Sequence, residues 1–505
     1  MKRKAKTTLE VSGSRTEQEA RFVPKPSLTF VVGITGHRSK RLKAGRRPLD
    51  RIAAQLAEVL RAIEEACAEE RRKHAAWYAE AAPRMRLVSS LSDGADHMAL
   101  AACPPHWKKV AVLPFPRKRA LEALLRDQDG EEAAAVAAGF EAALEQVPED
   151  DIVELPAEPV GPVKEDPSDE SGLVRASRFM LRQIDLLVAV WDGSQTVTPG
   201  GTTGVVARAL EAGIPVVWIS SVEEQTPWLI ARMSDVAHET PLADAREGPI
   251  AAAVAGVLGL RERGAGHGRG RSAEEQLAKF LAERRRTWCG STAYRLLAVF
   301  PRLWLWSPVI RLPDLAATQA QWREFLATAP DGRGFAARLE HILLPRYAAA
   351  DALATFFAHR YRSAYVLAYA LSVLAVLVAL LSFAPHDPRE DALVHKAKYV
   401  AVELLPVLWI GAIILMGSFG HWHDRWLDYR ALAEMLRHLR FLGLLGEYEL
   451  RAFAETAARP GAGWVLWYLR ATMRELGPPA GVLDESYQRR AIRAVEVAEV
   501  DDQIA

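Results

Sequence analysis

Cysteine is scarce in this chain, with three residues among 505, at Cys67, Cys103 and Cys289. They are far apart and lack CxxC spacing, which excludes a disulfide framework and a cysteine-rich zinc site. The chain also has almost no net charge, because 64 Lys and Arg are balanced by 63 Asp and Glu, which gives a formal net charge of +1. The composition gives no overall electrostatic reason to expect a nucleic-acid partner. We expect neither nucleic acid nor a bound metal.

An apolar core is missing from the first 26 residues, which are basic and polar. This excludes the hydrophobic region of a secretory signal. We predict a disordered basic leader over residues 1–26.

Strand-like and helix-like segments alternate over the first 220 residues. Short runs rich in apolar and β-branched residues predict six strands, at 28–35, 86–91, 109–115, 151–155, 184–191 and 214–220. Helical spacing separates them, most clearly over residues 49–77. Strands that are buried on both faces and joined by helices are typical of a parallel sheet. We therefore predict an α/β fold with a Rossmann-like, doubly wound parallel sheet at the N-terminus.

Two apolar stretches nearer the C-terminus have the length of membrane spans. Residues 364–384 carry no charge, and residues 399–420 carry one, Glu403. About 20 apolar residues are enough to cross a bilayer. The alternative is a buried helix of a soluble protein, which Glu403 and Pro406 favour more for the second stretch than for the first. We predict an α-helical membrane domain with two transmembrane helices, and hence a lipid bilayer as partner.

The predicted orientation depends more on the length of chain before the first span than on the charged residues that flank the spans. More than 350 residues without a signal come before it, and they would not readily cross a membrane. Flanking Lys and Arg modestly favour the same orientation. We predict a protein of the inner (cytoplasmic) membrane with two spans and both termini cytoplasmic. Residues 223–334 then form a helical connector with a flexible linker near 264–270, and residues 451–505 form a cytoplasmic helical tail.

Three loops that follow predicted strands have chemistry suited to a phosphate-bearing ligand. In such sheets ligands bind beyond the carboxyl ends of the strands. Glycines let the backbone approach a phosphate, Arg38 can pair with one bidentately, and Thr202 opens a helix with a positive N-terminus. The candidate ligand-binding residues are Gly36, His37, Arg38, Ser90, Gly94, Asp96, Asp192, Gly200, Gly201, Thr202 and Thr203.

Each of these loops also has a plain structural interpretation. A glycine after a strand is often only a turn, Thr202 is a possible N-cap, and Asp96 is a possible helix start. Neither GxxxxGK[ST] nor the spaced GxGxxG is present, which disfavours ordinary ATPases and dinucleotide-dependent dehydrogenases. The argument for a site rests on three loops at the same edge of one sheet.

The order of the motifs GITGHR, SSLSDGADHMA, DLLVAVWDG and PGGT resembles the SLOG superfamily of Rossmann-like domains. Relatives in that superfamily are the DNA-processing protein DprA, the lysine-decarboxylase-like LOG enzymes and the sensor region of TRPM channels. The resemblance covers about residues 27–222. It implies a pocket for a nucleotide-derived ligand, such as a cyclic nucleotide or an ADP-ribose derivative, and no other cofactor is expected.

A departure from the family pattern bears on catalysis. Hydrolytic LOG members carry a glutamate in PGGxGTxxE, whereas here no acid follows Gly201 until Glu211. This favours binding without turnover, and we predict no catalytic residue. Asp93, Asp96 and Asp192 are possible substitutes, so a membrane-anchored N-glycosidic hydrolase of nucleotides stays open as an alternative.

The segment from Trp426 to Arg437 reads W-x-x-Y-R-x-x-A-E-x-L-R and places an ordered face on one helix. It resembles the SLATT domain, a two-span effector associated with SLOG genes in bacterial defence systems, over about residues 335–450. The resemblance implies a membrane pore or perturbation. Glu403, Trp422 and Trp426 are candidate membrane or pore residues, although the tryptophans also suit interfacial anchors and Glu403 the outer interface.

Taken together, these patterns predict a membrane effector for antiphage defence. A nucleotide second messenger binds the α/β domain and triggers the two-span domain. Two helices cannot enclose an aqueous channel, so a pore requires a homo-oligomer. Besides the hydrolase, a membrane-tethered scaffold without a ligand is the remaining alternative.

Overall fold

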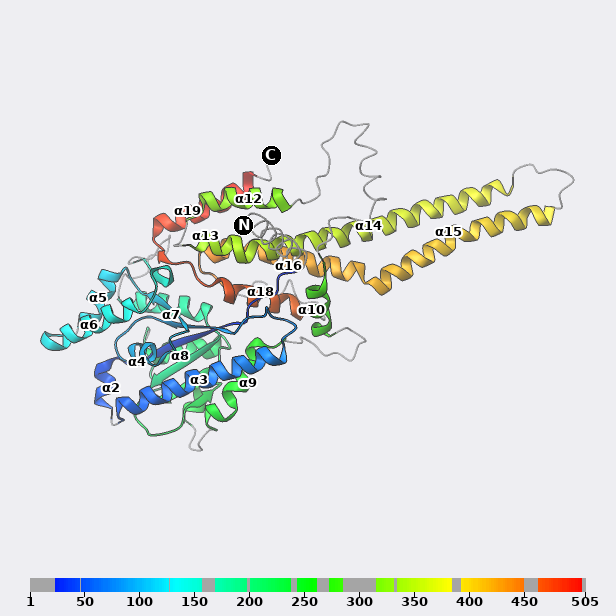
Figure 1. Ribbon diagram of the computed structural model, residues 1–505. Helices are drawn as coiled ribbons and strands as arrows, with labels where there is room; N and C mark the ends of the chain where they lie inside the picture. The colour runs from blue at the N-terminus through cyan, green and yellow to red at the C-terminus, as the bar shows by residue number, and fades with distance from the viewer. Residues whose placement is uncertain are drawn as a thin grey trace, which may run out of the picture. The chain divides into compact units, whose positions relative to one another are not determined.

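The computed structural model describes residues 23–45, 47–126, 128–156, 169–197, 200–237, 243–260, 272–284, 315–330, 334–383, 392–448 and 462–501. The chain forms two compact units (Figure 1). The larger is Pro24–Leu281 with Gln319–Pro345 and Met435–Ala505, and the smaller includes Arg346–Glu434. Most of the predicted leader and the predicted linker at 264–270 lie outside the described residues.

The larger unit is built on a sheet of eight strands in the order β7-β6-β5-β1-β2-β3-β4-β8. All neighbours are parallel except β6 and β7, which are antiparallel. The strands are β1 (Thr29–Gly36), β2 (Arg84–Ser89), β3 (Lys108–Leu113), β4 (Ile152–Glu154), β5 (Leu186–Trp191), β6 (Val216–Ser220), β7 (Trp228–Ile230) and β8 (Gly481–Val482).

The six predicted strands correspond to β1 through β6, so the predicted parallel sheet is confirmed. The chain builds β2, β3 and β4 on one side of β1 and then crosses to the other side for β5 and β6. The strand order therefore reverses between β1 and β5. In open sheets this is the place where the loops on either side diverge and leave a crevice.

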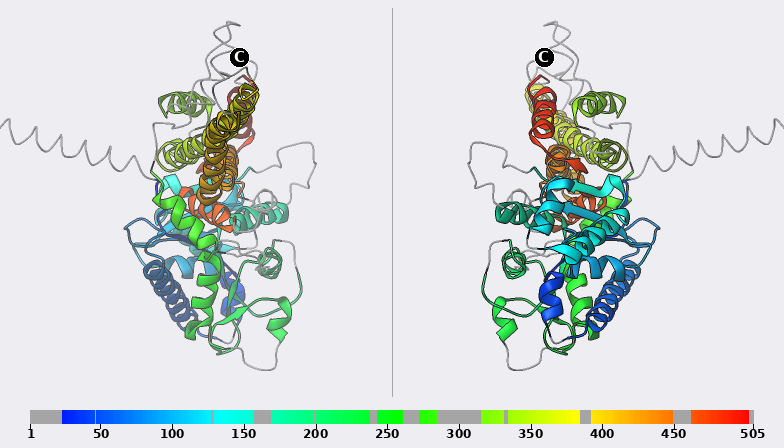
Figure 2. Two further views of the ribbon diagram at one scale, coloured as in Figure 1. Left: turned by 90° about the vertical axis from the view of Figure 1, so that its right-hand side faces the viewer. Right: turned by 90° about the vertical axis from the view of Figure 1, so that its left-hand side faces the viewer.

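Helices cover the sheet. They are α2 (Ser39–Ala44), α3 (Leu49–Lys73), α4 (Ala95–Ala102), α5 (Arg117–Leu125), α6 (Gly130–Glu145), α7 (Asp169–Gln183), α8 (Thr202–Glu211) and α9 (Pro249–Leu258). Ile52, Leu56, Val59 and Ile63 form the buried stripe of α3, as their three-to-four residue spacing requires. This helix lies alongside α9 (Figures 1 and 2).

The C-terminal region contributes to the same unit. In β8, Gly481 and Val482 pair with Val153 and Glu154 of β4, so residues that we placed in a separate helical tail form the edge of the sheet. Next to β8 are α18 (Gly463–Leu476) and α19 (Glu485–Glu496). A two-residue strand carries no alternation pattern, which is why sequence patterning did not reveal it.

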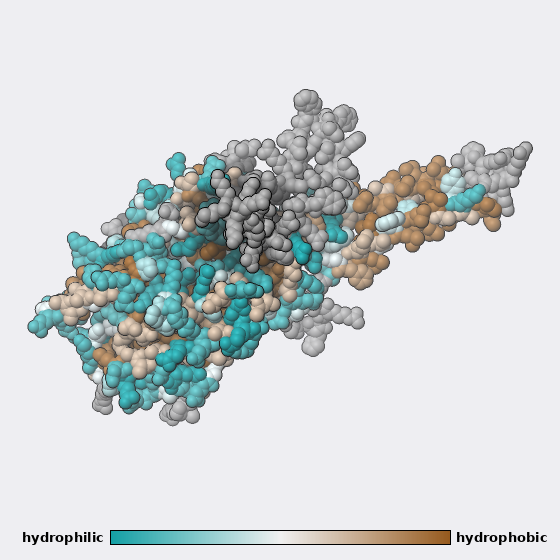
Figure 3. Space-filling view, in the orientation of Figure 1, coloured by the Kyte–Doolittle hydropathy of each residue, from teal (hydrophilic) through white to brown (hydrophobic). Residues whose placement is uncertain are grey.

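The smaller unit contains most of α14 (Leu344–Leu381), all of α15 (Ala392–Gly420) and the first part of α16 (Trp422–Leu444). Two helical segments, Phe335–Leu381 and Lys396–Gly420, are long and apolar enough to cross a membrane. In each, 6% of the most apolar window is buried, and Figure 3 shows an apolar surface along them. A core helix of a soluble protein would hide that surface, so the exposure favours membrane helices over the alternative.

Candidate functional site

A cavity of about 900 Å³ lies where the loops after β1, β2 and β5 meet α7 and the start of α8. This is the edge of the sheet at which the parallel strands end, next to the reversal between β1 and β5. Of the predicted ligand-binding residues, nine line it: Gly36, His37, Arg38, Ser90, Asp96, Gly200, Gly201, Thr202 and Thr203. Their convergence was expected from the loops, and their role in binding stays a prediction.

Two glycines allow the loops to pack this closely. A Cβ on Gly36 would lie 2.4 Å from Cβ of Ala95 and 2.6 Å from the carbonyl oxygen of Val190. Gly94 has φ of +93°, and a Cβ there would lie 2.5 Å from the carbonyl oxygen of His37. Gly94 therefore supports the wall of the cavity from behind, because it brings the first turn of α4 against the end of β1.

The N-terminus of α8 opens into the cavity without a side-chain cap from the described residues. Gly201 is the N-cap, with φ of −82°, so the suggestion that Thr202 caps the helix is wrong. The hydroxyl of Thr203 donates to the carbonyl oxygen of Ser194 at 3.0 Å, which attaches the loop after β5 to the helix. Backbone N–H groups at a helix start form a ready anion site, reinforced by the helix dipole.

A polar cluster joins the ends of β1 and β5. Nε2 of His37 lies 3.1 Å from Oδ1 of Asp192, and Nη2 of Arg41 lies 2.5 Å from Oδ2 of the same carboxylate. Burial opposes the charge on Asp192, but the N–H of Ser194 together with His37 and Arg41 outweighs it and lowers the pKa of Asp192. Burial also lowers the pKa of His37 despite its contact with Asp192, which favours the neutral imidazole.

Asp96 organises the loop after β2. Its Oδ2 accepts hydrogen bonds from the hydroxyl of Ser89 at 2.9 Å, the N–H of Ser90 at 3.1 Å and the N–H of Ser92 at 3.3 Å. Burial raises the pKa of Asp96 to about 7, against these three donors. Asp96 thus lies in the first turn of α4, as the helix-start interpretation predicted, and it also lines the cavity.

Asp93, another possible catalytic acid, also has a structural role. Its Oδ2 accepts from the N–H of Ser39 at 3.1 Å, and its Oδ1 lies 3.9 Å from Nε of Arg38. The guanidinium of Arg38 is part exposed and borders the cavity. The contact with Asp93 holds the start of α2 against the loop after β2.

Sequence reasoning missed part of the lining. Lys40 and Arg41 come one residue after the GITGHR motif and add two cations, while α7 supplies Leu173, Ser177 and Met180. The basic pair was visible beside the motif, whereas nothing in the sequence placed α7 over this edge. Asp192 contacts two lining residues, His37 and Arg41, from outside the wall.

The candidate membrane residues lie on α15 and α16. Glu403 is half-buried on α15. The ring of Trp422 lies 4.3 Å from the guanidinium carbon of Arg360, and that of Trp426 lies 5.6 Å from the guanidinium carbon of Arg362. Both tryptophans thus make cation–π contacts with α14 at one end of the apolar hairpin. Among the described residues no group of three metal ligands occurs.

Comparison with known proteins gives a match within this hairpin region. Residues 350–449 match the model of the DUF4231 family. The family is described as a protein of unknown function. The domain takes in most of α14 and all of α15 and α16, and it falls inside the region 335–450 that the sequence predicted as a membrane domain. No curated protein and no solved structure matches the chain.

Proposed function

We propose that this protein is a membrane effector controlled by a nucleotide-derived signal. The cavity at the reversal between β1 and β5 binds the signal, and the DUF4231 hairpin perturbs the membrane in response. The observation that carries the proposal is the convergence of three loops on one cavity of about 900 Å³. The resemblance of those loops to the SLOG superfamily supports a nucleotide-like ligand.

The cavity supplies two kinds of phosphate contact. Arg38, Lys40 and Arg41 line it, and the start of α8 at Gly201 and Thr202 presents backbone N–H groups. A phosphate here would interact with the charges of Arg38 and Lys40 and with the helix dipole, whereas Arg41 is already paired with Asp192. Met180 and Val205 offer apolar surface for the rest of a nucleotide.

The membrane step belongs to the two apolar helices. We propose a SLATT-like mode of action at the inner membrane, with both termini cytoplasmic, as in bacterial antiphage defence. Because two helices cannot line an aqueous channel, the active form is a homo-oligomer. Moving its equilibrium from 1:99 to 99:1 requires about 5.5 kcal/mol of differential ligand binding, which several subunits can share.

The test is ligand-dependent leakage from liposomes that contain the full chain and a trapped fluorescent dye. The panel consists of nucleotides, cyclic oligonucleotides and ADP-ribose derivatives. We expect one class to trigger leakage. Leakage that is equally fast without any ligand would contradict the signalling step, and leakage absent with every ligand would favour the scaffold.

Gly201 offers a matched pair of variants. Gly201→Asp and Gly201→Ser both introduce good N-cap residues at a backbone conformation that any residue adopts. Only the aspartate places a negative charge where the phosphate would lie. We expect Gly201→Asp to abolish the ligand response and Gly201→Ser to retain it, and equal loss in both would argue against a phosphate at this helix.

A second candidate, nucleotide N-glycosidic hydrolysis, is favoured by Asp96, which lines the cavity with a pKa of about 7. A group of that pKa is suited to general acid–base chemistry near neutral pH. The hydrolase predicts release of free base from a nucleotide by the wild-type chain and its loss in Asp96→Asn. Release that persists in Asp96→Asn would remove this residue as the acid or base.

A further inference from the structure

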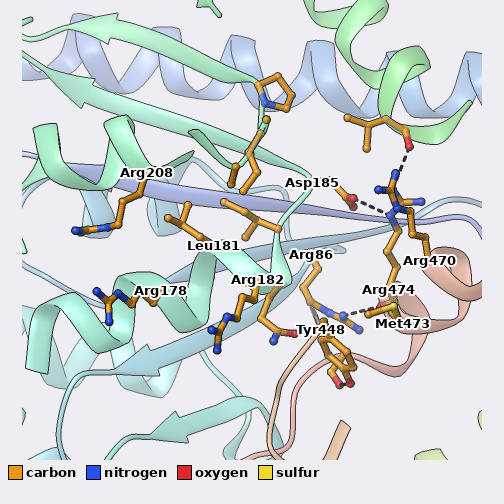
Figure 4. A pocket seen from close by; sticks show the side chains of 18 of the residues that line it. Arg86, Arg178, Leu181, Arg182, Asp185, Arg208, Tyr448, Arg470, Met473 and Arg474 are labelled. Carbon is orange, nitrogen blue, oxygen red and sulfur yellow. Dashed lines mark hydrogen bonds and ion pairs between the residues drawn. The ribbon is translucent and has the colours of Figure 1, made fainter. Parts of the chain in front are cut away.

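A second cavity, of about 620 Å³, lies at the opposite edge of the sheet, where β5 and β6 begin. Figure 4 shows its lining, which comes from α7, α8, the strand starts and α18. Six arginines line it, at Arg86, Arg178, Arg182, Arg208, Arg470 and Arg474. Two carboxylates, Asp185 and Glu211, oppose them, which leaves a formal excess of four positive charges.

Some of this charge is compensated within the fold. Nε of Arg474 donates to Oδ1 of Asp185 at 2.7 Å, and Nη1 of Arg86 donates to the carbonyl oxygen of Arg474 at 2.9 Å. Arg182 forms an ion pair with Glu447. These contacts hold the side chains of Arg474, Arg86 and Arg182 in place.

The other side of the cavity carries cations that repel each other. Burial first, and then the positive charge of Arg178, lower the pKa of Arg208. Arg208 donates from Nη2 to the hydroxyl of Ser177 at 3.1 Å, while its Nε is buried without a hydrogen-bond partner in the part of the chain that the structure describes. Arg178 is exposed and has no carboxylate partner there either. An anion between these two guanidinium groups would relieve their repulsion.

Helix dipoles explain only part of the charge. The helices α7 and α8 end at this edge, and each C-terminus carries about half a negative charge. Glu447, which pairs with Arg182, lowers the excess from four positive charges to three, and two helix ends offset about one of these. The helix ends by themselves therefore do not balance the arginine charge of this lining.

We propose that this cavity binds an organic polyphosphate of nucleotide size. Arginine forks bind phosphate bidentately, and several of them suit several phosphates. Apolar side chains of Leu181, Ile214, Val257 and Met473 line the same cavity and suit the organic part. The volume lies in the range of about 300–1,000 Å³ that is usual for small-molecule sites. This site shares no lining residue with the cavity of the proposed function.

Binding here would attach α18 to the sheet. Arg470 and Arg474 come from α18, whereas Arg178 and Arg208 come from α7 and α8. A ligand that contacts both groups connects segments that are more than 250 residues apart in sequence. It would therefore stabilise the folded state of the whole larger unit, because it binds that state and not the unfolded chain.

The test measures thermal unfolding of the full chain in lipid nanodiscs with inorganic tripolyphosphate or ATP, without divalent cations. Sodium chloride at equal ionic strength is the control for screening. We expect both probes to raise Tm by several degrees, ATP at lower concentration. The absence of a shift up to millimolar concentration of either probe would overturn the proposal. If tripolyphosphate raised Tm at concentrations as low as ATP does, the assignment of an organic ligand would be overturned.

Variants locate the effect. We expect Arg178→Gln and Arg470→Gln each to weaken the apparent affinity about fivefold to tenfold, and Arg61→Gln, on the exposed face of α3, to leave it unchanged. Arg178 is exposed, so its replacement leaves the fold intact even if Arg470→Gln does not. Arg41→Gln, in the first cavity, removes the contact with Asp192 and lowers the Tm without ligand, but it should leave the ligand-induced shift in Tm unchanged. A loss of the shift in Arg41→Gln rather than in Arg178→Gln would overturn the proposal without touching the proposed function.

Discussion

His37 and Asp192 join the ends of β1 and β5, with Nε2 of the imidazole 3.1 Å from Oδ1 of the carboxylate. They are 155 residues apart in sequence. The N–H of His37 donates to the carbonyl oxygen of Val190, so backbone and side chain both connect the two strands at the reversal of the sheet. This connection keeps Arg41 and the loop after β5 at the border of the cavity.

We expect Asp192→Asn to lower the free energy of unfolding at pH 7 by about 1–2 kcal/mol, because it removes charge-assisted contacts to Arg41 and His37. In the folded state the pKa of Asp192 lies below 3.8, the ordinary value of an aspartate. Its stabilisation is therefore present above that value and is lost as pH falls through the folded pKa. Thermal unfolding between pH 3 and 8 measures this, and the difference in stability between the two chains should become smaller toward the acid end.

The exposed Asp150 provides the control for charge alone. Asp150→Asn should change stability by less than about 0.5 kcal/mol at every pH. An equal effect of the two substitutions would mean that Asp192 acts only through the net charge of the chain.

Gly36 tests the close packing of the loops. Gly36→Ala places a Cβ 2.6 Å from the carbonyl oxygen of Val190. Because this oxygen cannot move without shifting β5, we expect the free energy of unfolding to fall by about 1–3 kcal/mol or more. At Gly256, inside α9, an added Cβ would meet nothing within 4 Å among the described residues, and Gly256→Ala should stabilise by about 0.5–1 kcal/mol. Thermal unfolding of both variants would show opposite signs, and the same sign in both would contradict the packing at Gly36.

Trp467 tests whether α18 belongs to the larger unit. Its Nε1 donates to the carbonyl oxygen of Leu258 at 2.7 Å, and its ring lies 5.6 Å from that of Trp77 and 5.3 Å from that of Tyr78. We expect Trp467→Ala to cost about 3–5 kcal/mol. Trp467→Phe should cost less, because it keeps most of the ring.

The exposed Ile492 of α19 is the control for this pair. Ile492→Ala should have little effect in the same thermal unfolding experiment. If Trp467→Ala were as harmless as Ile492→Ala, α18 would not pack on the rest of the larger unit in solution.

Much of the larger unit could be predicted because its signals are local. Each of the strands β1 to β6 is a short run of apolar and β-branched residues, and parallel strands bring the loops at their carboxyl ends to one edge. That geometry, rather than any single motif, explains why Gly36, Ser90 and Gly201 line the same cavity.

The remaining features arise from contacts between distant segments. Nothing in the sequence near Gly481 shows that it pairs with Val153, and nothing near Arg178 shows that Arg474 lines the same cavity. A fragment of residues 27–222 therefore lacks both α18 and β8, although sequence patterning presents it as a complete domain. These features could not be predicted because the contacting segments are far apart in sequence, and not because the residues have weak secondary-structure propensity.

The ionisation of Asp96 should make the stability of the larger unit depend on pH. Burial raises its pKa from 3.8 to about 7, so the folded state binds a proton that the unfolded chain has released between these values. The stabilisation that Asp96 gives is complete below pH 3.8 and is lost as pH rises through about 7. Asp96→Asn keeps an oxygen that can accept from Ser89 and Ser90 but cannot ionise. We expect the variant to lose less stability than the wild type between pH 5 and about 8, measured as Tm at each pH. Parallel curves for the two chains would show that Asp96 is already ionised at pH 5, and would exclude it as a proton donor at neutral pH.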